Sequence, residues 1–183
     1  MNRLESAELF AKDKHLGIMQ TDGITPYWKH LESVVSRLKN IGIKDEEIMC
    51  AAWLHDVIDD TDTTFDDIYQ IFGQNVAVMV LAVSKDKKLH KKDRELQYIQ
   101  QLKNASWQAQ LIKLCDISSD LKNLQNSGQS RTRKSKQIKI KLHYINAIKS
   151  GLAQNKSQIP GIESIVDAVN VVLKKYGHKA VLI

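Results

Sequence analysis

Apolar residues recur at intervals of three and four along most of the chain, which is the period of an amphipathic α-helix. One apolar stripe runs through residues 4–15 and another through residues 26–40, and the loop between them holds the turn residues Gly23 and Pro26. The same pattern predicts helices over residues 4–15, 26–40, 45–59, 65–72, 75–84, 92–103, 105–124, 136–153 and 161–176. Thr64 and Asp67 form a capping-box pattern at the start of the fourth helix.

The segment over residues 75–84 is the one ambiguous element. It is apolar on all sides and rich in valine, so a strand is the alternative, but the helical pattern around it favours a buried helix. The chain has 8 glycines and 2 prolines, which is too little turn punctuation for an all-β fold. We therefore predict an all-α protein of seven to nine helices.

Length and composition favour one domain. The 183 residues can bury a sizeable core, so we predict a single domain over 1–183 with its core in 5–125. Helices within 136–176 would pack on that core, and the stretch 126–135 is the best linker candidate. We expect residues from 130 onward to contribute packing alone.

The sequence also bears on the compartment. The chain contains no run of 18 apolar residues, so we expect no membrane-spanning helix. The N-terminus is charged where a signal peptide needs an apolar region. Cys50 and Cys115 lie in apolar stretches, as expected of buried thiols in a reducing environment. We expect a cytoplasmic protein without a membrane partner.

The net charge of +6 is concentrated in two basic runs, residues 85–94 and 131–141. Either run could contact a nucleic acid or an anionic substrate, and a solvated basic loop is the alternative. No nucleic-acid-binding motif accompanies the runs, and aromatic residues make up 6% of the chain, which leaves few platforms for stacking bases. These features argue against a nucleic-acid partner.

The most informative segment is residues 48–61, where an apolar helical stretch turns acidic. On a continuous helix, His55, Asp56, Asp59 and Asp60 would share one face spanning an arc of about 140°. Crowded carboxylates at the negative end of a helix are unfavourable, and a bound divalent cation would reverse that. The alternative is a helix that ends at Val57 with its acids facing water.

Two further polar residues lie in apolar helical stretches, His30 and Asp116. A histidine in such a place is more often a satisfied core residue, but a buried unpaired aspartate is costly. With His55 and Asp56 they offer imidazole and carboxylate ligands from three helices, leaving coordination positions open for water and substrate.

The order His, His-Asp, Asp resembles the HD-domain phosphohydrolases. The closer resemblance is to the hydrolase domain of the Rel/SpoT alarmone enzymes and their small stand-alone homologues, over about residues 5–125. The segments that carry it are FAKDKHLG (10–17), TPYWKH (25–30), AAWLHDVIDDTDTT (51–64), FGQNVAVMVLAVSKDKKLHKKDR (72–94) and LIKLCD (111–116).

This resemblance implies an all-α fold, one divalent metal, usually Mn²⁺, and hydrolysis of a phosphate ester of a small-molecule nucleotide. The implied metal ligands are His30, His55, Asp56 and Asp116. Asp59 and Asp60 would orient and deprotonate the attacking water. The implied basic partners of the substrate phosphates are Lys92, Arg94 and Lys113.

Three positions depart from the family pattern. Gln20 stands where an arginine usually stacks on the guanine, and an amide supplies no charge there. Asp59 replaces a glutamate, which retracts the carboxylate by one methylene. Asp120 replaces an asparagine and adds negative charge where a nucleotide approaches. These changes spare the metal ligands and alter the predicted substrate pocket.

Three functional hypotheses follow from these observations. The first is a 3′-pyrophosphohydrolase of (p)ppGpp, and the second is the same chemistry on another substrate such as a nucleoside monophosphate or NADPH. The third is an HD module that senses a nucleotide without turnover. The sequence does not determine the oligomeric state, and it allows a homo-oligomer.

Overall fold

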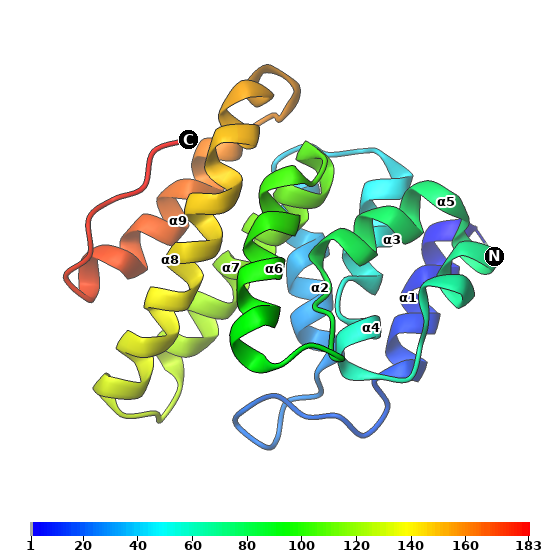
Figure 1. The fold of residues 1–183 in the computed structure, drawn as a ribbon, viewed down its shortest axis with the longest axis horizontal. Helices are drawn as coiled ribbons and strands as arrows, with labels where there is room; N and C mark the ends of the chain where they lie inside the picture. Colours follow the sequence, from blue (N-terminus) through cyan, green and yellow to red (C-terminus); the bar gives the residue numbers. More distant parts are fainter. Residues whose placement is uncertain (1) are drawn as a thin grey trace.

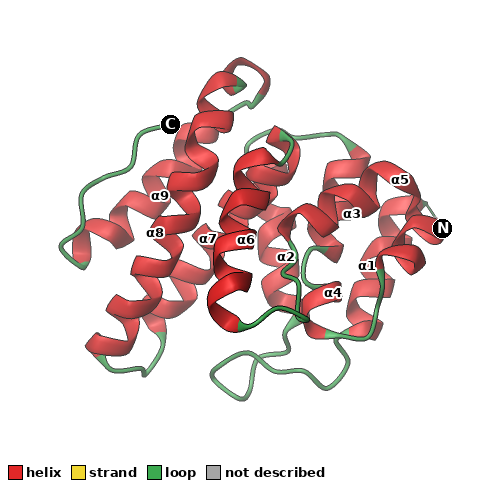
Figure 2. Cartoon of the chain, in the orientation of Figure 1, coloured by secondary structure: helices red, strands yellow, loops and turns green. Residues whose placement is uncertain are grey.

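The computed structural model describes residues 2–183, which form nine α-helices and one short 3-10 helix (Figures 1 and 2). The α-helices are α1 (Arg3–Lys14), α2 (Trp28–Asn40), α3 (Glu46–Leu54), α4 (Val57–Asp60), α5 (Phe65–Val83), α6 (Lys91–Asn104), α7 (Trp107–Asn126), α8 (Arg131–Gln154) and α9 (Ile162–Lys175). The 3-10 helix is η1 (Lys156–Gln158). Within the described residues there is no strand beyond one isolated bridge between Met19 and Pro26, so the all-α prediction is confirmed.

Helix α7 lies in the middle of the molecule. It contacts α2, α3 and α5 on one side and α8 and α9 on the other (Figure 1). Thirteen of its twenty residues are buried, including the polar Asp116, Ser118 and Ser119. One continuous hydrophobic cluster runs from Ala7 in α1 to Val181 beyond α9, so α8 and α9 share the core of the earlier helices.

Helix starts follow the capping signals in the sequence. Asn2 and Thr64 each form a capping box with the acid three residues later, as predicted for Thr64. Asp45, Ser106 and Ser130 cap α3, α7 and α8 through their side-chain oxygens. Each cap satisfies backbone N–H groups that the first turn of a helix leaves without partners.

The helix predicted over 45–59 is wrong as a single element. It breaks at His55 and Asp56, which separate α3 from the one-turn helix α4. The His55 ring nitrogen Nδ1 lies 2.8 Å from the carbonyl oxygen of Ala52, the oxygen that would accept the N–H of residue 56 if the helix continued. The acids therefore do not share one face of a continuous helix.

The segments 65–72 and 75–84 are two helical stretches that meet within α5 at Gly73, whose backbone is not helical. Gly73 has φ of 79° and ψ of 172°, a conformation that glycine adopts without a Cβ penalty. The helical interpretation of 75–84 is confirmed, but the prediction that it is buried all round is wrong. Val78 is 50% exposed and Leu81 is 45% exposed, so α5 has an open apolar face.

The linker predicted at 126–135 is also wrong. The loop between α7 and α8 covers only residues 127–130, because Ser130 caps α8 and the helix begins at Arg131. The second basic run is therefore helical rather than a loop. Further along α8, Gly151 passes close to Gln110 of α7, whose side-chain amide donates to the carbonyl oxygens of Leu102 (3.0 Å) and Lys103 (3.3 Å).

Two expectations about buried and membrane segments can be compared with the fold. Cys50 and Cys115 are both buried free thiols, as predicted. Among residues 2–183, no helix combines the length and the apolar character that a membrane span requires.

Candidate metal centre

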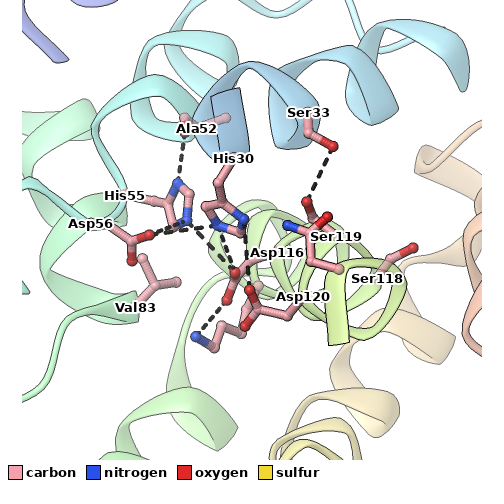
Figure 3. A network of polar contacts seen from close by, with 12 residues as sticks. His30, Ser33, Ala52, His55, Asp56, Val83, Asp116, Ser118, Ser119 and Asp120 are labelled. Atoms are coloured by element: carbon pink, nitrogen blue, oxygen red, sulfur yellow. Dashed lines mark hydrogen bonds and ion pairs between the residues drawn. The ribbon is translucent and has the colours of Figure 1, made fainter. Parts of the chain in front are cut away.

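Three helices bring the four predicted metal ligands together (Figure 3). His30 comes from the first turn of α2, His55 and Asp56 come from the turn after α3, and Asp116 comes from the middle of α7. His30, His55 and Asp116 are at most 4% exposed, and the Asp56 side chain is 17% exposed. Residues separated by up to 86 positions therefore meet in one buried cluster.

The two imidazoles and two carboxylates face one another at short range. Nε2 of His55 lies 3.0 Å from Oδ2 of Asp56 and 3.8 Å from Oδ1 of Asp116. Nε2 of His30 lies 3.1 Å from Oδ1 of Asp116 and 3.6 Å from Oδ2 of Asp56. The potential ligand atoms form two groups, each within 4.8 Å, His30–His55–Asp56 and His30–Asp116–Asp120, which share His30.

The histidine nitrogens of this cluster fit a metal ion. Nδ1 of His55 donates to the Ala52 carbonyl oxygen, so Nδ1 carries a proton and Nε2 is the nitrogen that faces the carboxylates. Among residues 2–183, Nε2 of His30 and Nε2 of His55 are buried and form no hydrogen bond, although carboxylate oxygens lie 3.1 and 3.0 Å away. Two imidazole nitrogens with two carboxylate oxygens form a donor set that divalent transition metals accept.

The charges of the cluster shift the pKa values of its members. Burial favours the neutral imidazole of His55, but Asp56 and Asp116 outweigh it and raise the pKa of His55 well above its usual value. The pKa of His30 is raised too, because Asp116, Asp120 and Asp56 overcome the effect of burial. The carboxylates therefore favour positive charge at this position.

Two neighbours hold the carboxylates in place. The Tyr27 hydroxyl donates to Oδ2 of Asp56 at 2.7 Å, and Lys113 donates to Oδ2 of Asp116 at 2.7 Å. Lys113 is itself buried, and its ammonium lies 5.5 Å from the ring centre of Tyr98 and 5.6 Å from that of Tyr144. The structure therefore places Lys113, predicted to bind phosphate, in an ion pair with a predicted ligand.

Asp59 and Asp60 follow the cluster on α4. Oδ1 of Asp59 accepts the backbone N–H of Lys85 at 2.9 Å, which leaves its other oxygen free of this bond. Oδ2 of Asp60 lies 3.9 Å from Nε2 of His15. Burial, together with the charge of Asp56, raises the pKa of both carboxyls. Raised pKa values make these carboxylates stronger bases than free aspartate.

A cavity of about 240 Å³ opens beside His30. Its lining residues include Gln20 and Asp120, as predicted for the substrate pocket, and also Tyr27, Asn123, Gln137 and Lys141. Gln20 accepts a hydrogen bond from Asn123 at 3.2 Å, and Asp120 forms an ion pair with Lys141. The cavity wall therefore comes from the 15–27 loop, from α7 and from α8.

The contribution of α8 to this cavity was missed, because residues from 130 onward were expected to contribute only packing. Lys141 lies three residues after Ile138 and four before Ile145, both fully buried. Such spacing places a residue on the buried face of a helix. The signal was thus a lysine within the apolar stripe of α8.

The HD domain family matches residues 7–145, which include all four predicted ligands. The chain belongs to this family. That match, rather than the dipeptide His55-Asp56 alone, decides the assignment.

Relatives of this HD domain include a zebrafish (Danio rerio) protein, guanosine-3′,5′-bis(diphosphate) 3′-pyrophosphohydrolase MESH1, which is 41% identical over 117 residues. The bifunctional (p)ppGpp synthase/hydrolase SpoT of Escherichia coli K12 is 32% identical over 165 residues, 87% of this chain and 23% of that protein. A solved structure of a metazoan SpoT ortholog, described as hydrolysing ppGpp, superposes with a TM-score of 0.82 at 26% identity and covers 97% of both chains.

The sequence matches cover only part of the relatives. The matched segment is 63% of this chain and spans 65% of the zebrafish protein, and the match to the Drosophila melanogaster MESH1 protein spans 57% of that protein. The structural match covers 97% of this chain and so extends beyond residue 145, where the family match ends.

Two predicted phosphate-binding residues lie on α6, which provides none of the four predicted ligands. Among residues 2–183, Lys92 and Arg94 of α6 form no hydrogen bond or ion pair with the four ligands, and Lys92 is exposed. The basic segment reaches the site through Lys85 instead, whose backbone N–H holds Asp59. Lys85 also donates to Glu95 and to the Tyr144 hydroxyl, both at 2.7 Å.

Proposed function

We propose that the protein is a metal-dependent phosphohydrolase that removes the 3′-pyrophosphate of (p)ppGpp. The observation that carries this proposal is the buried cluster of His30, His55, Asp56 and Asp116, whose two imidazole Nε2 atoms face carboxylate oxygens at 3.1 and 3.0 Å. The relatives named for this activity support the choice of substrate. Mn²⁺ is the proposed metal, and the two buried free thiols support a reducing, cytoplasmic location.

The side chains around the cluster have different proposed roles in hydrolysis. A bound divalent cation supplies a Lewis acid that polarises a phosphoryl oxygen and lowers the pKa of water. Asp59 is the proposed base, because Lys85 fixes one of its oxygens and burial raises its pKa. Asp60 orients the water. The water oxygen bonds to phosphorus and its proton passes to the Asp59 carboxylate. The phosphorus–O3′ bond breaks, and the departing O3′ takes up a proton from solvent, which leaves a 3′-hydroxyl and pyrophosphate.

The cavity beside His30 suits the nucleoside part of such a substrate. Its lining offers the amides of Gln20, Asn123 and Gln137, which can hydrogen-bond the edges of a base or ribose hydroxyls. It holds one lysine, Lys141, and that charge is paired with Asp120. This neutral lining favours no particular nucleotide, so the same chemistry on another nucleotide, such as NADPH or a nucleoside monophosphate, is the second candidate.

Turnover tests the proposal directly. Protein loaded with Mn²⁺ is incubated with ppGpp, pppGpp, NADPH and nucleoside monophosphates, and products are resolved by ion exchange. We expect pyrophosphate release from (p)ppGpp that EDTA abolishes. Asp59→Asn should lower kcat by at least about 100-fold, since a positioned general base contributes about 10²–10⁴-fold.

The matched control is Asp66→Asn, which removes an exposed acid on α5 and should leave turnover unchanged. Phosphate release from another member of the panel, without cleavage of (p)ppGpp, would keep the metal chemistry and replace the substrate. If protein that binds Mn²⁺ and a nucleotide releases no product from any member of the panel, the result would favour an HD module that senses a nucleotide without turnover.

A further inference from the structure

The imidazole of His30 faces a carboxylate at each of its two nitrogens. Nε2 faces Asp116 at 3.1 Å and Asp56 at 3.6 Å, inside the candidate metal centre. Nδ1, on the opposite edge of the ring, lies 3.6 Å from Oδ1 of Asp120 (Figure 3). The metal cluster and Asp120 are therefore connected through one imidazole ring.

Asp120 is held at this edge by α8. Its second oxygen, Oδ2, forms an ion pair with the ammonium of Lys141, whose side chain is only 19% exposed. Lys141 stands between the fully buried Ile138 and Ile145 on the inner face of α8, so packing fixes where its side chain emerges. The order Lys141, Asp120, His30 thus runs from α8 through α7 to α2.

We propose that Asp120, held by Lys141, is a positioning residue that orients His30 for metal binding. At 3.6 Å the Asp120 carboxylate acts on Nδ1 through its charge rather than through a hydrogen bond, and it favours a proton on that nitrogen, which leaves Nε2 for the metal. Carboxylate–histidine–metal arrangements of this kind raise the basicity of the ligand and fix the ring orientation. The inference rests on the metal site proposed above and gives Asp120 a role other than substrate contact.

The charges of the cavity support this role over a contact with substrate phosphate. Both oxygens of Asp120 already face a partner, Lys141 on one side and His30 on the other. An unpaired carboxylate in the cavity would repel a phosphorylated ligand, whereas the pair with Lys141 brings no net charge. The departure from asparagine at position 120 is therefore compatible with a working metal centre.

Metal affinity separates the two roles. Mn²⁺ binding to the full chain is followed by the electron paramagnetic resonance signal of the free ion, with no nucleotide present. Asp120→Ala should raise the Kd for Mn²⁺ by about 10- to 100-fold, the usual effect of losing such a partner. Asp120→Asn keeps an oxygen acceptor without its charge, so its Kd should lie between those of the wild type and Asp120→Ala.

Lys141→Met tests the outer link, and Lys139→Met on the same helix is its matched control, because Lys139 is exposed. Lys141→Met should weaken Mn²⁺ binding several-fold, and Lys139→Met should leave it at the wild-type value. In Asp120→Ala, adding Lys141→Met should cost nothing more, since the lysine acts through Asp120. Circular dichroism and thermal melting check that each variant folds.

A wild-type Kd for Mn²⁺ in folded Asp120→Ala would overturn the inference and leave the metal site standing. A raised KM for nucleotide with unchanged Mn²⁺ affinity would also overturn it and make Asp120 a substrate contact. Wild-type protein that binds no Mn²⁺ would overturn the proposed metal site itself. The three results are distinguishable because the first readout involves no substrate.

Discussion

At the scale of single residues, His55 and Asp56 show how adjacent side chains reach one site. The chain turns between α3 and α4, and the His55 ring holds the Ala52 carbonyl oxygen at the break. Both side chains then point at the same volume as His30 and Asp116. A continuous helix would separate adjacent side chains by about 100° around its axis.

Metal binding should compete with protons at His30 and His55. The carboxylates raise the pKa of both rings, so the metal-free site carries protons that Mn²⁺ must displace. Affinity for Mn²⁺ should therefore rise with pH until both rings are neutral. Calorimetric titrations in buffers of different ionisation enthalpy should show proton release on binding.

The same shifts set the sign of a stability effect in metal-free protein. A histidine whose pKa is raised by folding stabilises the folded state fully below its ordinary pKa of about 6.5. That contribution is lost as the pH rises through the pKa of the histidine in the folded state.

Affinity for Mn²⁺ that stays constant between pH 6 and 9 would contradict the predicted competition between Mn²⁺ and protons.

The two thiols should be unreactive in the folded protein. Burial raises the pKa of Cys50 to about 11 and that of Cys115 to about 12, so almost no thiolate exists at pH 8. Unfolding returns both to about 8.5, so the folded state loses relative stability as the pH rises above that value. Ellman's reagent at pH 8 should react slowly with native protein and fully with urea-unfolded protein. Fast labelling of native protein would show that at least one thiol is accessible to the reagent, which would contradict the prediction.

Residue identity was the most predictable part of the site. His30, His55, Asp56 and Asp116 could be singled out because buried polar groups are costly and because their order matches a known family. Lys141 is marked in the sequence only as a lysine within the apolar stripe of α8, and its pairing with Asp120 depends on which face of α8 meets α7. That packing is set by contacts between segments far apart in the chain.

At the scale of elements, Gly73 joins the two helical stretches of α5 through a kink. Its φ of 79° lies in the region that other residues reach only with strain, and an added Cβ would come within 3.3 Å of the Arg3 guanidinium. Gly73→Ala should therefore destabilise the protein by about 1–3 kcal/mol. Urea unfolding measures the difference.

Gly128→Ala is the matched control for the kink. Gly128 lies in the α7–α8 loop without a positive φ, and an added Cβ would meet no atom within 4 Å. It should leave the free energy of unfolding within about 0.5 kcal/mol of the wild type. Equal effects of the two substitutions would contradict a specific role for the Gly73 conformation.

Helix existence could be predicted from the apolar period, whereas several helix limits could not. The apolar period predicts one helix over 45–59, because the spacing of apolar residues carries no information about the hydrogen bond between the His55 ring and the Ala52 carbonyl oxygen. The start of α8 at Arg131 depends on the Ser130 cap within a stretch whose composition is typical of a linker. Local hydrogen bonds decided both limits.

At the scale of the whole molecule, the candidate site joins α2, α7 and the α3–α4 turn (Figure 1). A ligand that binds only the folded state stabilises it, by about 2.7 kcal/mol at a concentration of 100 Kd. Mn²⁺ should therefore raise the melting temperature, and EDTA should reverse the rise. The double variant His30→Ala/His55→Ala should lose the shift.

The control for that experiment is Mn²⁺ with a variant that lacks an exposed histidine, His143→Ala on α8. Its melting temperature should rise as in the wild type. An equal Mn²⁺ shift in His30→Ala/His55→Ala would place the metal somewhere other than the four-residue cluster.

Gly151 of α8 lies against the side chain of Gln110 of α7. A Cβ at position 151 would collide with the Gln110 amide, which is buried and bound to the end of α6. Ten residues of helix, about 15 Å, separate Gly151 from Lys141. Gly151 thus allows α8 to pack closely against α7 on the same helix that brings Lys141 to Asp120. We expect a larger side chain at position 151 to push α8 away from α7 and, through the proposed Lys141–Asp120 link, to weaken Mn²⁺ binding.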